Sequence, residues 1–137
     1  GEMEALGKMC PPQFLEPENK DVPFSTLAFT LGKDRKAYFI PSNRHFDYGA
    51  AFESYGEEDE KPTASLIAFD LQLNQRQDIG ILQTIDGRHI FGCEAATCGP
   101  DGTIYFCGAV EENDPDKATG RIAGKYPSAL KLLMYKP

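Results

Sequence analysis

The sequence has no tryptophan and only two histidines in 137 residues, and its 14 lysines and arginines are outnumbered by 21 acidic residues. The net charge of −7 disfavours non-specific binding to nucleic acid or to an anionic membrane surface, because both depend on cationic side chains. No run approaches the roughly 18 apolar residues that a membrane helix needs. We therefore expect neither a nucleic-acid nor a membrane partner, and an aromatic core built from the 9 Phe and 6 Tyr.

Several catalytic and nucleotide-binding motifs are also missing from the sequence. It contains no P-loop, no dinucleotide-binding glycine pattern, no G-x-S-x-G and no H-E-x-x-H. The sequence therefore identifies no cofactor. It also leaves the cellular compartment open.

Four cysteines, at positions 10, 93, 98 and 107, allow three complete pairings. If Cys98 faces Thr103 across a hairpin turn, Cys98 and Cys107 share a face but lie on the order of 13 Å apart. Cys93 and Cys107 then lie on opposite faces, so neither pair meets disulfide geometry. We expect free, buried cysteines, while a bridge from Cys10 stays open. The cysteine spacing does not indicate a zinc site.

An internal repeat dominates the sequence. Residues 90–108, IFGCEAATCGPDGTIYFCG, predict a strand, a tight turn over 99–102 and a second strand. Residues 23–41, PFSTLAFTLGKDRKAYFIP, predict the same hairpin with its turn over 32–35. One offset of 67 relates the matching residues, which are Gly32 and Gly99, Asp34 and Asp101, Tyr38 and Tyr105, and Phe39 and Phe106.

Each hairpin is followed by a long connection and a further strand. In the first copy we expect strands over 24–31, 36–41, 65–71 and 74–82. In the second copy the third strand is expected over 128–135, and the fourth strand is missing. The connections are expected at 10–23, 42–64, 83–89 and 109–127.

These motifs resemble β-propeller blades. GPDGTIYF and SLIAFDL…QRQDIG are similar to the blades of the β-propeller superfamily that includes streptogramin lyase-like, gluconolactonase-like and oligogalacturonate lyase-like proteins. The expected fold class is all-β, with two four-stranded antiparallel blades in a single segment over 1–137. Blade 1 spans about 24–82 and blade 2 about 89–135. Residues 2–8 resemble an outer strand and are expected to complete blade 2, in this chain or in a neighbour.

Two blades cannot close a ring, since propellers have about four to eight. The apolar faces of each blade must nevertheless be covered. The partners implied are therefore the remaining blades, supplied either by a longer protein or by a homo-oligomer. A compact β-sandwich that is not a propeller is the remaining alternative.

The resemblance places the long connections together on a ligand-binding rim. Arginine can clamp a carboxylate with two hydrogen bonds, and histidine can act as a base. The candidate site residues for an anionic sugar or another carboxylate are Arg44, His45, Asp47, Tyr48, Arg88 and His89. The alternative is that these are ordinary loop residues.

Glu94 is a further candidate, because it lies in an otherwise apolar strand where the first copy has Leu27. We expect it to be buried, either as a channel-lining acid or metal ligand, or paired with a nearby arginine or backbone amides.

Three functions compete. The first is a propeller segment that binds a small polar ligand, such as a carbohydrate. The second is a lyase or hydrolase that uses His45 or His89. The third is a structural or protein-interaction propeller.

Overall fold

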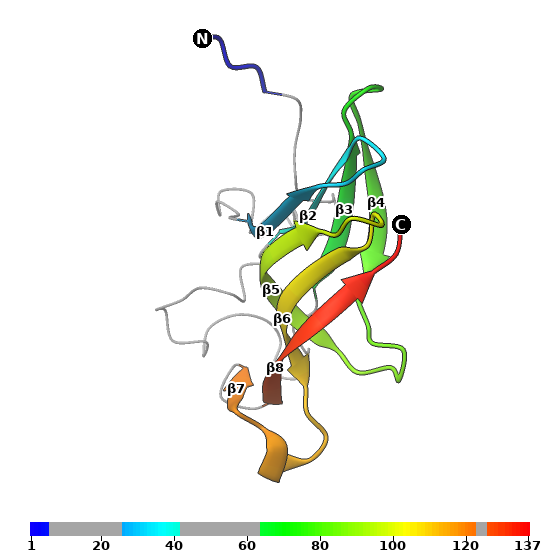
Figure 1. Ribbon diagram of the computed structural model, residues 1–137. Coiled ribbons are helices and arrows are strands. Elements are labelled where there is room, and N and C mark those ends of the chain that lie inside the picture. The colour runs from blue at the N-terminus through cyan, green and yellow to red at the C-terminus, as the bar shows by residue number, and fades with distance from the viewer. Residues whose placement is uncertain (6–25, 42–63, 123–125) are drawn as a thin grey trace.

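The computed structural model describes residues 1–5, 26–41, 64–122 and 126–137, and these residues form an all-β fold (Figure 1). The strands are β1 (Thr26–Leu31), β2 (Lys36–Pro41), β3 (Ser65–Asp70), β4 (Gln75–Ile81), β5 (Ile90–Cys98), β6 (Ile104–Glu111), β7 (Gly120–Ile122) and β8 (Tyr126–Tyr135). Within these described ranges, one short 3-10 helix, η4 (Pro115–Lys117), lies between β6 and β7.

The strands make two four-stranded antiparallel sheets, as predicted. Sheet 1 has the order β1-β2-β3-β4, and sheet 2 has the order β5-β6-β8-β7. Sheet 2 is strongly curled, and both sheets are consistent with propeller-like blades. In Figure 1 the curled strands β5, β6 and β8 cross in front of sheet 1.

The fourth strand of sheet 2 differs from the expectation. We expected no fourth strand from residues 109–127, but β7 arises there and pairs with residues 126–128 of β8. Beyond that short pairing, residues 129–135 of β8 have no second neighbouring strand in the described part of the chain. Residues 1–5 are exposed and form no strand, and residues 6–8 lie outside the described residues, so completion of blade 2 by residues 2–8 stays a prediction.

The two hairpins share one register, which extends the repeat from sequence to backbone pairing. Adding 67 to the pair Leu31↔Ala37 gives the observed pair Cys98↔Ile104. The register shift between residues 26 and 28 likewise recurs between residues 93 and 95. The expected pairing of Cys98 with residue 103 is therefore wrong by one, because Gly99 and Thr103 close the turn through a backbone hydrogen bond of 2.8 Å.

Three residues lie between the closing pair of each turn. The third of them adopts a left-handed conformation, at Arg35 (φ 63°) in one hairpin and at Gly102 (φ 88°) in the other. Three-residue hairpin loops that end in a left-handed residue are a common connection between antiparallel strands. Only the second copy places glycine there, the residue that adopts this conformation without a steric cost.

The first glycine of each turn is required by a tyrosine packed over it. A Cβ at Gly32 would lie 2.7 Å from Cε2 of Tyr38, and one at Gly99 would lie 2.9 Å from Cε2 of Tyr105. Both distances are shorter than real Cβ contacts. The repeated spacing of glycine and tyrosine is therefore a packing requirement of the hairpin.

The core lies between the sheets. We call the side of sheet 1 that carries Tyr38 and Leu66 its front face, and the side of sheet 2 that carries Phe106 and Tyr135 its back face. These two faces pack together in one cluster, and the rings of Tyr38 and Tyr135 lie 6.1 Å apart across it. Other members of the cluster are Ala28, Ile40, Ala64, Ala68, Ile104 and Val110.

Three cysteines are described, and all three are free. Cys98 packs against the core, whereas Cys107 pairs with Ala95 on the opposite side of sheet 2. The prediction that these two share a face was therefore wrong, a consequence of the register error. The prediction of free cysteines is confirmed for the three described positions, but only Cys93 is buried, and Cys98 and Cys107 are half-buried. Within the described residues, no helix is long and apolar enough to span a membrane.

Candidate functional site

The predicted rim site is only partly described. Arg44, His45, Asp47 and Tyr48 lie outside the described residues. Arg88 and His89 lie just before β5, and Glu94 lies within it. The structure therefore addresses only the half of the predicted site that adjoins sheet 2.

Arg88 is held by the turn that precedes it. The Thr84 hydroxyl accepts a hydrogen bond of 2.9 Å from the Arg88 amide, and the Thr84 amide donates one of 3.0 Å to the Arg88 carbonyl. Gly87 supplies the left-handed residue of this turn, with φ 81°. The short segment Thr-Ile-Asp-Gly-Arg thus forms a closed loop that fixes the start of β5.

The Arg88 guanidinium already has protein partners. Its Nε lies 2.8 Å from Oδ2 of Asp86, and its Nη1 lies 3.4 Å from the Glu111 carbonyl oxygen. A hydrogen bond from the Thr84 hydroxyl, followed by the charge of Arg88, lowers the pKa of Asp86. A carboxylate ligand would have to compete with Asp86 for the guanidinium, which weakens the expectation of a bidentate clamp.

His89 joins the beginning of β5 to the end of β6. Its amide donates to Oε2 of Glu111 over 3.3 Å, and its carbonyl oxygen accepts from the Glu111 amide over 2.9 Å. The Nδ1 atom of its ring is buried and has no hydrogen-bond partner in the described part of the chain. A buried polar atom in that state costs free energy unless something pairs with it. Among the described candidates, His89 therefore stands out by a buried ring nitrogen without a hydrogen-bond partner.

Glu94 is exposed, so the expectation that it is buried was wrong. It lies in the register shift between Cys93 and Ala95, where the strand holds one more residue than its partner. Such a bulge leaves the extra residue unpaired and turns it away from the ladder. A carboxylate can therefore occupy an apolar strand here without entering the core.

The described residues contain no group of three or more His, Cys, Asp and Glu side chains arranged to hold a metal ion.

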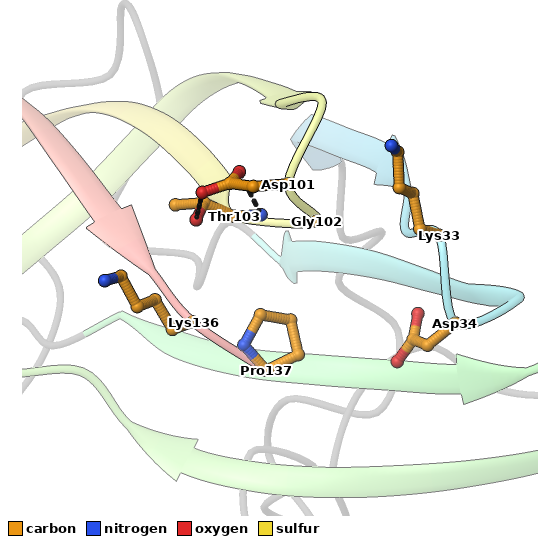
Figure 2. A pocket seen from close by; sticks show the side chains of 7 residues that line it. All are labelled: Lys33, Asp34, Asp101, Gly102, Thr103, Lys136 and Pro137. Carbon is orange, nitrogen blue, oxygen red and sulfur yellow. Dashed lines mark hydrogen bonds between the residues drawn. The ribbon is translucent and has the colours of Figure 1, made fainter.

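A cavity of about 430 Å³ lies at the opposite end of the sheets, between the two hairpin turns. Figure 2 shows side chains from both turns and from the segment after β8 around it. The cavity was not predicted, although the repeated turns indicate that residues 32–35 and 99–102 lie at one end of the fold. Its lining residues are Lys33, Asp34, Asp101, Gly102, Thr103, Lys136 and Pro137.

The carboxylates of this cavity serve the turns. Asp34 accepts a 2.6 Å hydrogen bond from the Tyr38 hydroxyl, and burial together with this carboxylate raises the pKa of Tyr38. Asp101 accepts from the Thr103 amide at 3.0 Å and from its hydroxyl at 2.9 Å, which lowers the pKa of Asp101 (Figure 2). Lys33 donates to the Pro100 carbonyl oxygen. These bonds engage Lys33 and both carboxylates within the two turns, and Lys136 also lines the cavity.

The most unusual surface of the chain is the front face of sheet 2, the side opposite the core. On β8 it presents Leu130, Leu132 and Met134, which are 61 %, 76 % and 64 % exposed. The residues paired with these on β6 are Ala109, Cys107 and Tyr105. Alternation along the strands places Ala95 and Thr97 of β5 on the same side. None of these eight side chains carries a charge.

The repeat identifies the equivalent surface in sheet 1. Tyr38 corresponds to Tyr105 by the offset of 67. Ala68 pairs with Tyr38 as Met134 pairs with Tyr105, so the repeat equivalents of Leu130, Leu132 and Met134 are Ala64, Leu66 and Ala68, in that order. The residues of sheet 1 are 3 %, 0 % and 1 % exposed because sheet 2 covers them. One face of the repeat is therefore buried in sheet 1 and open in sheet 2.

Comparisons of the chain with protein-family models, with curated proteins and with solved structures gave no match. The likeness to propeller blades accordingly rests on the repeat and on the two sheets.

Proposed function

We propose that this chain is an assembly module of the β-propeller type, two consecutive blades that bind another β-sheet through an apolar sheet face. The observation that carries the proposal is the contrast between Leu66, which is fully buried, and its repeat equivalent Leu132, which is 76 % exposed. Of the three functions considered from the sequence, this is the structural or protein-interaction propeller.

Energetics support this choice. Burying one leucine side chain contributes about 1.5–3 kcal/mol, and the front face of sheet 2 presents two leucines, a methionine and a tyrosine together. Contiguous apolar surface of this kind marks interaction sites in soluble proteins. The apolar side chains in the middle of this face suit a second sheet, because two sheets pack about 10 Å apart with their side chains interdigitated.

Methionine oxidation tests whether the front face is covered in solution. The purified chain is treated with hydrogen peroxide over a range of protein concentrations, and oxidation at Met134 and Met3 is followed by peptide mass spectrometry. Met3 is fully exposed and serves as the control within the same molecule. We expect Met134 to oxidise at least about tenfold more slowly than Met3 once the face is covered.

Equal oxidation rates for Met134 and Met3 at every concentration would overturn the proposal, because an assembly module must cover this face. Unfolding the chain with urea gives the reference rates, which should become equal for the two residues.

A second candidate function is binding of a small anionic sugar at the rim, and the buried, unpartnered Nδ1 atom of His89 favours it. The probe is galacturonate, titrated calorimetrically into wild type, His89→Gln and a control, Gln83→Ala. Heat of binding that His89→Gln abolishes and Gln83→Ala preserves supports this function, while its absence in wild type rejects it for this probe. A lyase or hydrolase using His45 or His89 stays a prediction.

A further inference from the structure

We infer that the sheet docking on the front face of sheet 2 belongs to a second copy of this chain, which presents the back face of its own sheet 1. Copies then associate head to tail. This inference rests on the proposed assembly function and specifies its partner.

The interface inside one chain supplies the template. There the front face of sheet 1 packs against the back face of sheet 2, with Tyr38 from one side meeting Tyr135 from the other at 6.1 Å. Each sheet is one copy of the repeat, so this is a front-to-back contact between two like units. This contact buries the front face of sheet 1 and the back face of sheet 2. The front face of sheet 2 and the turn end of the back face of sheet 1 are left over, whereas Ala37, Phe39 and Ile67 of that back face are already buried within the chain.

The back face of sheet 1 carries the side chains that this docking needs. Phe69 corresponds to Tyr135 through the pairs Ala37↔Phe69 and Ile104↔Tyr135, while Phe39, the equivalent of Phe106, is already buried within the chain. At its turn end this face is open, since Phe29 and Leu31 are 52 % and 55 % exposed and Phe69 is half-buried.

The template then predicts the central contact between copies. Tyr105 is the equivalent of Tyr38, so it should meet Phe69 of the second copy as Tyr38 meets Tyr135. An aromatic pair of this kind contributes beyond its buried area. The ion pair of Arg76 and Asp78, 3.0 Å apart on the outer strand of sheet 1, lies beside Phe69 and Ile67 and supplies a polar rim.

Head-to-tail contacts leave one open face at each end of any chain of copies, so they produce either a closed ring or an open filament. With two sheets per copy, the usual ring sizes of about four to eight blades correspond to about two to four copies. The two-fold alternative, front face against front face, stops at a dimer and leaves the back face of sheet 1 unused.

A complementation experiment distinguishes these geometries. Leu132→Arg blocks the front face, Leu31→Arg blocks the back face, and Leu73→Arg is the matched control, because Leu73 is 66 % exposed in the turn between β3 and β4, outside the strands that form the two faces. All three replace an exposed leucine, so folding should be preserved, and far-ultraviolet circular dichroism checks this. Met134→Arg and Phe29→Arg form a second pair should either variant fail to fold.

Sedimentation velocity is the readout. We expect wild type and Leu73→Arg to associate, and Leu132→Arg and Leu31→Arg each to remain at 15.1 kDa, with association weakened at least about tenfold. An equimolar mixture of the two blocked variants keeps one intact interface and should form a species of twice that mass, and no larger one.

Self-association of Leu31→Arg equal to that of wild type would overturn the head-to-tail geometry while leaving the assembly function standing. A wild-type chain that stays at 15.1 kDa while Met134 is protected from oxidation would reject the second copy as partner. A monomer with Met134 as reactive as Met3 would reject the assembly function itself.

Discussion

Truncating the two equivalent leucines, Leu66 and Leu132, should have opposite consequences for stability. Leu66→Ala removes a fully buried side chain from between the sheets. Such truncations cost about 2–5 kcal/mol, because the lost burial adds to the cost of the cavity. Against a typical stability of about 5–15 kcal/mol, this variant should lose a large part of its free energy of unfolding.

Leu132→Ala is the same chemical change at the same position of the repeat. Because Leu132 is 76 % exposed, its truncation should change the stability of a dilute, dissociated chain by no more than about 0.5 kcal/mol. At concentrations where copies associate, the same variant should lose stability relative to wild type, since folding and association are linked.

Urea denaturation followed by far-ultraviolet circular dichroism measures both variants, and tyrosine fluorescence is a second probe because the chain has no tryptophan. The slope of the unfolding free energy against urea should be unchanged in each. Equal costs for the two variants in dilute solution, or a cost below about 1 kcal/mol for Leu66→Ala, would refute the reasoning that only one of the two faces is buried within the chain.

Three further predictions concern the hairpins and the core. Gly32→Ala should destabilise the fold by about 1–3 kcal/mol, because its Cβ would lie 2.7 Å from the buried Tyr38 ring; thermal unfolding measures this, and an unchanged midpoint would contradict it. Hydrogen bonds from the Thr103 amide and then from the Thr103 hydroxyl lower the pKa of Asp101 in the folded chain. The stabilisation that the Asp101 carboxylate provides is therefore present above the unfolded pKa of 3.8 and is lost as the pH falls through the lower folded pKa. Asp101→Asn should accordingly show a shallower loss of stability in acid, and an identical acid profile would count against this prediction. Burial raises the pKa of Cys93 to about 12, so iodoacetamide at pH 8 should alkylate Cys98 and Cys107 before Cys93, with peptide mass spectrometry as the readout and faster alkylation of Cys93 as the contrary result.

The turn motifs carried most of the predictive information about the fold. Glycine and aspartate followed by tyrosine at the same spacing located both hairpins, and the structure gives the reason, since the glycine makes room for the tyrosine ring and the aspartate caps the turn. The exact pairing was missed by one residue. The left-handed third residue of the turn shifts the strand pairing by one residue, and arginine at position 35 gives no sequence signal for that conformation.

The other errors have local causes. Glu94 was expected inside because periodicity assumes a regular strand, whereas the bulge at this position turns the residue out. The short strand β7 was missed because three residues, Gly120–Ile122, carry no readable alternation. For Arg88, the sequence did show a competing carboxylate two residues earlier, and the structure pairs the two side chains at 2.8 Å.

The open face of sheet 2 was anticipated only in general terms, as apolar blade surface that needs a cover. Which of the faces is open depends on how the two sheets pack, and that follows from tertiary contacts between Tyr38 and the residues around Tyr135. Sequence alone could not decide between front-to-back packing and front-to-front packing, because both bury apolar residues.

Front-to-back packing of the two repeats is the premise of the whole account, and nuclear Overhauser effects between assigned aromatic protons test it most directly. With ring centroids 6.1 Å apart, Tyr38 and Tyr135 should give cross-peaks in a dilute, dissociated sample. Cross-peaks from Tyr38 to Tyr105 or Met134 instead, with none to Tyr135, would mean that the front faces meet each other and would contradict the account.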